Sequence, residues 1–195
     1  ELNYVSDVDV IFVAEPANEI ATEIAKLVMS ACSAITTEGM IWEVYAALRP
    51  EGKAGALVRT LTSHMDYYNK WAQSWEYQAL LKARYMAGDE NLGNAFVDSV
   101  APYVWEAAGR EGFIESVQAM RQRVTDLLPA KEAERELKLG RGGLRDVEFA
   151  VQLLQMVHGR SDVMVRSPNT LQALEQLATW GYVGREDASA LAQAY

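Results

Sequence analysis

The sequence predicts an α+β fold, in which a small sheet domain at residues 1–60 precedes a mostly α-helical domain at residues 61–195. Two patterns support this prediction. Apolar side chains alternate along residues 4–15, as they do on a strand, and from Thr60 onward they recur at helical spacing. With 195 residues and a hydrophobic share of 50%, the chain is long enough to bury a core of its own.

The expected sheet domain contains two strands, one helix and a further short apolar segment. The strand over residues 4–15 has no turn signal before it, so we expect part of the fold to lie upstream, and Pro16 ends it. The second strand is expected at residues 41–46, before a turn at residues 49–52 and an apolar segment around Val58. Between the strands, one helical face is marked by Ile20, Ile24, Leu27, Val28 and Ala31.

The second domain is expected to consist of helices separated mostly by Gly, Pro or Asp. The predicted ranges are 61–86, 91–105, 113–127, 144–158, 169–178 and 186–195. Four aromatic residues at helical intervals favour a packed core over base stacking: Tyr68, Trp71, Trp75 and Tyr77. His64 and His158 have no Cys or carboxylate partners at metal-ligand spacing, which favours structural or exposed positions.

Composition argues against several classes of partner. The formal net charge of -9 repels a phosphate backbone, so nucleic acid is not expected to bind. No apolar run reaches the roughly 18 to 20 residues that a membrane span needs. The single cysteine, Cys32, cannot form an internal disulfide and is expected to be a small apolar helix residue, which is typical of a protein of the reducing cytoplasm.

A pair of carboxylates, Asp7 and Asp9, lies at the front of the first expected strand. Residues two apart on a strand point to the same face, about 6.6 Å apart at ~3.3 Å per residue. Two like charges ~4 Å apart cost on the order of 4 kcal/mol at an effective dielectric constant near 20. Either a hard divalent cation such as Mg²⁺ offsets this repulsion, or the two carboxylates diverge into water at a solvated strand end.

Four segments, which occur in the same order in a known family, carry a resemblance. They are ELNYVSDVDVIF at residues 1–12, WEV and LRPEG within 42–52, WEYQALLKAR at 75–84, and KLGRGGLRDVEF at 138–149. In these segments the chain resembles the glutamine synthetase adenylyltransferases, which belong to the DNA polymerase β-like nucleotidyltransferase superfamily. The resemblance implies that residues 1–60 form a partial nucleotidyltransferase core, whose glycine-rich phosphate-binding turn lies upstream of Glu1.

The family carries two nucleotidyltransferase halves with opposite activities. Similarity implies that the C-terminal half uses ATP to attach AMP to a tyrosine of glutamine synthetase, and that the N-terminal half removes it by phosphorolysis and releases ADP. Residues 138–140, 151–155 and 158–160 resemble the N-terminal, adenylyl-removing half more closely. The implied partners are glutamine synthetase and a PII signalling protein, and the implied ligands are Mg²⁺ and ATP or ADP.

The resemblance also implies roles for individual residues. Asp7 and Asp9 would hold the metal and act in catalysis. Ser6, Arg49, Gly142, Gly143 and Arg145 are the candidate nucleotide-binding residues. Residues 140–143 open a helix and are either an anion site or a flexible joint, while Arg49 either faces the nucleotide or stabilises its turn.

One position departs from the family pattern. In the family the strand before LRP carries a third catalytic carboxylate, an Asp, where this chain has Tyr45. A phenol with a reference pKa of about 10 adds no negative charge near neutral pH. Glu43, two residues earlier on the same strand face, is a candidate substitute ligand or a surface residue. The chain is therefore expected to be either an adenylyl-transfer enzyme or an impaired nucleotidyltransferase-like module that binds glutamine synthetase or PII.

Overall fold

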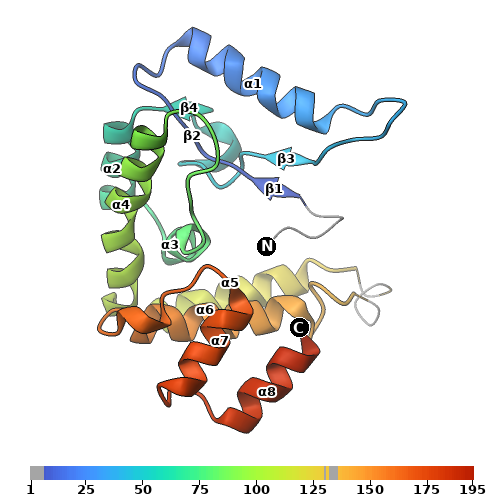
Figure 1. The fold of residues 1–195 in the computed structure, drawn as a ribbon, viewed down its shortest axis with the longest axis vertical. Helices are drawn as coiled ribbons and strands as arrows, with labels where there is room; N and C mark the ends of the chain where they lie inside the picture. Colours follow the sequence, from blue (N-terminus) through green and yellow to red (C-terminus); the bar gives the residue numbers. More distant parts are fainter. Residues whose placement is uncertain (1–6, 130, 132–135) are drawn as a thin grey trace. The chain divides into compact units, whose positions relative to one another are not determined.

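The computed structural model describes residues 7–129, 131 and 136–195, and in this part of the chain the fold is mixed and mostly helical (Figure 1). The chain divides into two compact units. The first takes the described residues up to Ala72 together with Arg84–Val100, and the second takes Gln73–Ala83 and Ala101–Tyr195. The expected boundary between sequence domains at residue 60 stays a prediction. None of the helices in the described residues is long and apolar enough to span a bilayer.

The first unit contains four short strands that form two parallel pairs. β1 (Val8–Asp9) pairs with β3 (Val44–Tyr45), and β2 (Phe12–Val13) pairs with β4 (Val58–Arg59). The predicted strand over residues 4–15 is therefore interrupted in its described part, because the chain changes its pairing partner between Asp9 and Phe12. Residues 4–6 of that prediction lie outside the described residues.

The helix α1 (Glu19–Ser33) connects the strands and contacts β3 and β4. Its start is capped by Asn18, whose side-chain oxygen accepts a hydrogen bond from the Ala21 N–H at 3.0 Å. Ala25 is buried, whereas a second apolar face is exposed at Ile20, Ile24, Leu27 and Val28. The predicted helix is confirmed. Its contacts with the strands bury only part of its apolar surface, and the remaining apolar side chains are exposed.

The predicted helix over residues 61–86 is two helices. α2 (Leu61–Lys70) is capped by Thr60, and α3 (Ser74–Leu80) starts after a break at which the Gln73 N–H donates to the Glu76 carboxylate at 2.7 Å. The break at Gln73 separates α2 from α3, so the four aromatic residues predicted to lie on one helix do not share one face. Tyr68 and Tyr77 are buried as expected, but Trp71, at the end of α2, is 70% exposed.

The remaining helices agree with the predicted ranges to within a few residues. They are α4 (Glu90–Glu106), α5 (Phe113–Asp126), α6 (Leu144–His158), α7 (Thr170–Thr179) and α8 (Arg185–Ala194), with short 3-10 turns η1 (Gly52–Ala54), η2 (Ala107–Gly109) and η3 (Val163–Val165). In the second unit, α6, α7 and α8 pack around one apolar cluster, whose buried members are Val147, Val151, Val165, Ala173, Leu174, Leu177 and Ala188.

Candidate functional site

The pairing of β1 with β3 brings two of the predicted catalytic positions together in the first unit. Asp9 lies directly opposite Tyr45 in the parallel register. The Val8 N–H donates to the Glu43 carbonyl at 2.8 Å, and the Val10 N–H donates to the Tyr45 carbonyl at 2.7 Å. Asp9 and Tyr45 are both exposed, whereas Val8 and Val44 are partly buried, so the polar side chains share the solvent-facing side of this pair of strands.

Tyr45 is the centre of this polar group. Its hydroxyl donates to Oε2 of Glu43 at 2.9 Å, and its side chain is 40% exposed. The pKa of Tyr45 is raised, first by this hydrogen bond and by the charge of Glu43, then by partial desolvation and by the charges of Asp7 and Asp9. Both aspartates therefore contribute to the raised pKa of the phenol, while the shared site for their two carboxylates stays a prediction.

The chemistry of this donor set suits a magnesium ion. Asp9 of β1 and the residue before the strand, Asp7, are both exposed and supply hard carboxylate oxygens, and Mg²⁺ is commonly held by one or two carboxylates with water and substrate phosphates as its other ligands. In residues 7–129, 131 and 136–195, no group of three His, Cys, Asp or Glu side chains is placed to hold a metal. Ser6, the neighbouring nucleotide-binding candidate, lies outside the described residues.

Arg49 is engaged with the turn that follows β3. Its Nη1 donates to the Ala46 carbonyl at 2.6 Å, its Nε to the Gly55 carbonyl at 3.1 Å and its Nη2 to the Lys53 carbonyl at 3.1 Å. These three bonds close the loop around residues 49–55. This arrangement agrees with the expectation that Arg49 stabilises its own turn. Contact between Arg49 and a nucleotide stays a prediction.

The glycine-rich segment before α6 forms a closed turn in the second unit. Gly142 has a φ of +73°, in the left-handed region that favours glycine. A Cβ on Gly143 would lie 2.5 Å from the Leu137 carbonyl oxygen, so only glycine fits there without a backbone shift. The N–H groups of Leu144 and Arg145 donate to the carbonyls of Leu137 and Lys138, both at 2.9 Å.

Arg121 of α5 holds this turn in place, a role that the sequence did not indicate. Its guanidinium donates to Asp146 Oδ1 at 2.5 Å and to the carbonyls of Leu139 and Gly140 at 3.1 and 3.0 Å. The other oxygen of Asp146 accepts from the Gly142 N–H at 2.6 Å. The N–H groups expected to bind an anion at Gly142 and Arg145 thus donate to protein oxygens, and anion binding here stays a prediction.

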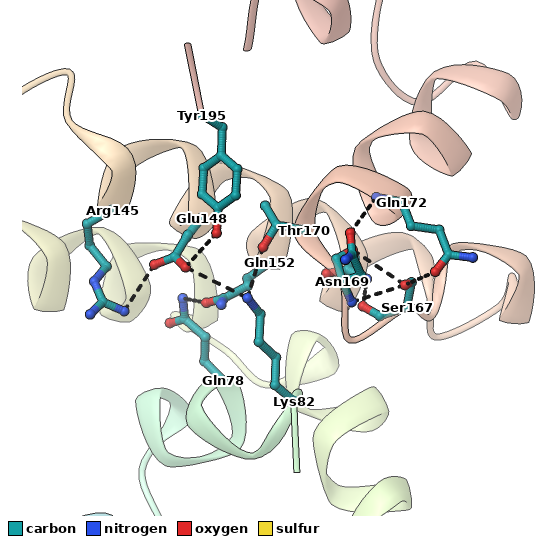
Figure 2. A network of polar contacts seen from close by, with 11 residues as sticks. Gln78, Lys82, Arg145, Glu148, Gln152, Ser167, Asn169, Thr170, Gln172 and Tyr195 are labelled. Atoms are coloured by element: carbon teal, nitrogen blue, oxygen red, sulfur yellow. Dashed lines mark hydrogen bonds and ion pairs between the residues drawn. The ribbon is translucent and has the colours of Figure 1, made fainter. Parts of the chain in front are cut away.

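A polar network in the second unit joins two of the segments that carry the family resemblance (Figure 2). Glu148 of α6 forms ion pairs with Arg145 at 3.2 Å and Lys82 at 3.8 Å, and accepts from the Tyr195 hydroxyl at 3.2 Å. Lys82 Nζ also donates to Thr170 Oγ1 at 2.9 Å. Arg145, a nucleotide-binding candidate, is therefore already paired with a carboxylate.

The same network continues through neutral side chains. Gln78 donates to Gln152 Oε1 at 2.9 Å, which links α3 to α6. At the start of α7, the Ser167 hydroxyl donates to Gln172 Oε1 at 2.9 Å, and the Gln172 N–H donates to Asn169 Oδ1 at 2.9 Å. The segments at 75–84 and 138–149 were recognised separately from the sequence, but their contact depends on the fold of the second unit.

Comparisons with known proteins divide the chain into two matched parts. The family model of glutamate-ammonia ligase adenylyltransferase matches residues 1–99, which include the carboxylate pair and Tyr45. The family model of GlnD PII-uridylyltransferase matches residues 112–195, which include Glu148 and its partners Arg145 and Tyr195.

Full-length relatives agree with the first of these matches. Proteins named bifunctional glutamine synthetase adenylyltransferase/adenylyl-removing enzyme are 61% identical in Streptomyces avermitilis, 60% in Nocardia farcinica and 57% in Corynebacterium efficiens. Each alignment covers 100% of this chain but only 18–20% of the relative, so the chain spans about a fifth of their length. With half of its residues in the family match, the chain belongs to the glutamate-ammonia ligase adenylyltransferase family.

Proposed function

We propose that the chain takes part in adenylyl transfer on a tyrosine of glutamine synthetase, in the direction that removes AMP by phosphorolysis and releases ADP. The observation that carries the proposal is Asp9 of β1, paired with position 45 of β3 and preceded by Asp7 at the start of that strand, within the part of the chain that the adenylyltransferase family matches. Residues 1–60 are proposed as part of a nucleotidyltransferase core, and residues 61–195 as its helical domain.

The roles of the residues follow from their chemistry. Asp7 and Asp9 would hold magnesium, which when bound supplies positive charge to the phosphoryl group and to the attacking and leaving oxygens. With magnesium bound, the two carboxylates would position the phosphoryl group on the exposed side of β1, and most of the rate would come from alignment. Ser6, Arg49, Gly142, Gly143 and Arg145 are proposed as nucleotide-binding residues, of which Arg145 would exchange its ion pair with Glu148 for a phosphate.

The assignment to the adenylyl-removing half rests on the sequence of residues 138–160. The names of the relatives contain both activities, so membership of the family does not fix the direction of the reaction. The direction is therefore a separate proposal. Glutamine synthetase follows as the proposed protein partner. The GlnD PII-uridylyltransferase match at residues 112–195 supports a PII signalling protein as a second proposed partner.

Tyr45 favours a second candidate function, a binding module without turnover. The residue stands where the family has its third carboxylate, and its hydroxyl is engaged with Glu43 rather than adding charge beside Asp9. In this alternative the chain binds glutamine synthetase or PII but does not accelerate adenylyl transfer.

One assay separates the two candidates. The 195-residue chain is incubated with adenylylated glutamine synthetase, phosphate and Mg²⁺, and the release of ADP is measured. We expect release that falls by about 100-fold in Asp9→Asn, since replacement of residues that merely support metal ligands already costs roughly 10- to 100-fold. Asp98→Asn, an exposed aspartate of α4, is the control. Binding of glutamine synthetase without ADP release would select the second candidate.

A further inference from the structure

Tyr45 combines three properties that an acceptor of a transferred group needs. Its side chain is 40% exposed, so a ligand can reach it. Its hydroxyl is hydrogen-bonded at 2.9 Å to the Glu43 carboxylate, which can accept the proton. It also lies across the strand pair from Asp9, at the position where the proposed function places the reacting phosphoryl group.

We propose that the Tyr45 hydroxyl is itself an adenylyl acceptor, so that the chain carries a self-modification site within its candidate active site. This inference rests on the proposed function, because it uses the same carboxylates and the same group transfer. It differs in the acceptor, which here is a phenol of this chain and not a tyrosine of another protein.

The atoms of the step balance with an adenine nucleotide as the only co-reactant. The Tyr45 oxygen attacks the α-phosphorus of ADP, and a new bond from the phenol oxygen to phosphorus forms. The bond from the α-phosphorus to the bridging oxygen breaks, and inorganic phosphate leaves with that electron pair. The phenol proton passes to Glu43. This step is the reverse of phosphorolysis, so phosphate in excess removes the group again and regenerates ADP.

Neighbouring tyrosines of the first unit show why the position is distinctive. Tyr68 is buried, with a relative exposure of 1%. Tyr85 is partly buried, and its hydroxyl donates to the backbone carbonyl of Gly88 at 2.8 Å, so that a carbonyl stands where Tyr45 has a carboxylate. Tyr85 serves as a control for Tyr45, because its phenol is partly accessible and is hydrogen-bonded to a backbone carbonyl in place of a carboxylate.

The test measures covalent mass and the site of modification. The 195-residue chain is incubated with Mg²⁺ and ADP, and in a parallel sample with Mg²⁺ and ATP, and is then analysed intact and after proteolysis. We expect one added adenylyl group from ADP, on the peptide that contains Tyr45, and its loss on later addition of phosphate. Tyr45→Phe and Asp9→Asn should abolish the addition, Glu43→Gln should slow it by roughly tenfold, and Tyr85→Phe should retain it.

The outcomes distinguish this inference from the proposed function. If adenylylated glutamine synthetase releases ADP but Tyr45 gains no adenylyl group, the self-modification is wrong and the proposed function stands. If Tyr45 is modified from ATP alone, the acceptor role stands and the assignment to the adenylyl-removing half is wrong. Modification that persists in Tyr45→Phe, with melting showing that the variant is folded, overturns the inference, as does modification of Tyr85 to the same extent.

Discussion

At the scale of single residues, the site depends on how much negative charge β1 and β3 present. Asp7 and Asp9 provide two carboxylates, while Tyr45 occupies the third position with a phenol whose pKa is raised, mainly by its hydrogen bond to Glu43. A phenol with a raised pKa stays protonated near neutral pH. The charge available to a cation is therefore smaller than three carboxylates would supply.

We accordingly expect Mg²⁺ to bind weakly in the absence of nucleotide, with a dissociation constant on the order of millimolar, because affinity follows the number of charged ligands. Asp7→Asn should remove the remaining binding, whereas Asp98→Asn should not. Isothermal titration calorimetry with MgCl₂ measures both. Tight, saturable binding in the wild-type chain, or an unchanged isotherm in Asp7→Asn, would contradict the assignment of these carboxylates.

Substitution of Tyr45 tests the third position directly. Tyr45→Asp adds a unit of negative charge opposite Asp9, so without metal it should lower the melting temperature by repulsion. With Mg²⁺ the sign should reverse, because the metal binds the folded state more tightly, and ADP release should rise. The measurement is melting and ADP release for both versions, with and without Mg²⁺. If neither quantity changes, position 45 does not face the site, and Glu43 is the next residue to replace.

At the scale of elements, the helices were predicted more closely than the strands. Their apolar spacing and their caps at Asn18 and Thr60 are local signals, which a sequence displays directly. Strand length depends on partners distant in the chain, and the predicted strand at 4–15 is interrupted where pairing changes from β3 to β4. The break between α2 and α3 was missed because the aromatic spacing continues across it.

The candidate site shows the same limit. The two aspartates could be predicted from alternation along one strand, and Tyr45 from a family pattern. The Arg121 contacts to Asp146 and to the turn before α6 could not, since Arg121 lies 25 residues from Asp146 and its spacing marks no motif. Contacts of this kind become visible only when α5 and α6 are packed against each other.

Arg121 offers a test of how the glycine-rich turn is held. Its side chain is 12% exposed, and Arg121→Gln removes the guanidinium donor from the carbonyls of Leu139 and Gly140 and from Oδ1 of Asp146. We expect the free energy of unfolding to fall by about 2 kcal/mol, and amide exchange at residues 137–146 to accelerate. Exposed Arg123 on the same helix is the control, for which Arg123→Gln should change stability by less than about 0.5 kcal/mol.

An unchanged exchange rate in Arg121→Gln would mean that the turn is held by its backbone bonds and its glycines alone. The N–H donations of Leu144 and Arg145 would then suffice. Asp146→Asn distinguishes the two contributions, because it keeps the shape of the side chain but weakens the bonds from Arg121 and from the Gly142 N–H.

At the scale of the whole molecule, stability is divided between two compact units, each with its own buried side chains. The first unit buries His64, Tyr68 and Phe96 together, and the second buries the apolar cluster of α6, α7 and α8. A measurement of unfolding therefore has to use a signal that comes from one unit alone. The buried histidine belongs to the unit that also carries Asp7, Asp9 and Tyr45, so its protonation bears on the stability of the candidate site.

His64 makes the stability of the first unit depend on pH. Burial lowers its pKa from 6.5 to about 4, against a hydrogen bond with the Phe12 carbonyl that raises it, and the charge of Arg59 lowers it further. Because the unfolded chain binds the proton more readily, stability is complete above pH 6.5 and is lost as pH falls toward 4. The expected loss is about 3 kcal/mol, from a shift of roughly 2.5 pH units at about 1.4 kcal/mol each.

Amide exchange of α2, measured between pH 4 and 6.5 in the wild-type chain and in His64→Asn, isolates this contribution. Exposed carboxylates titrate over the same range in both chains, so only the difference between their stability slopes belongs to His64. The wild-type chain should lose stability more steeply, and His64→Asn should be less stable at pH 7 because its smaller side chain leaves the contacts with Tyr68 and Phe96 incomplete. Parallel slopes would contradict the prediction, because they would mean that His64 is protonated as readily in the folded first unit as in the unfolded chain. The relative exposure of 1% and the ring contacts of His64 are the reasons to expect slopes that differ.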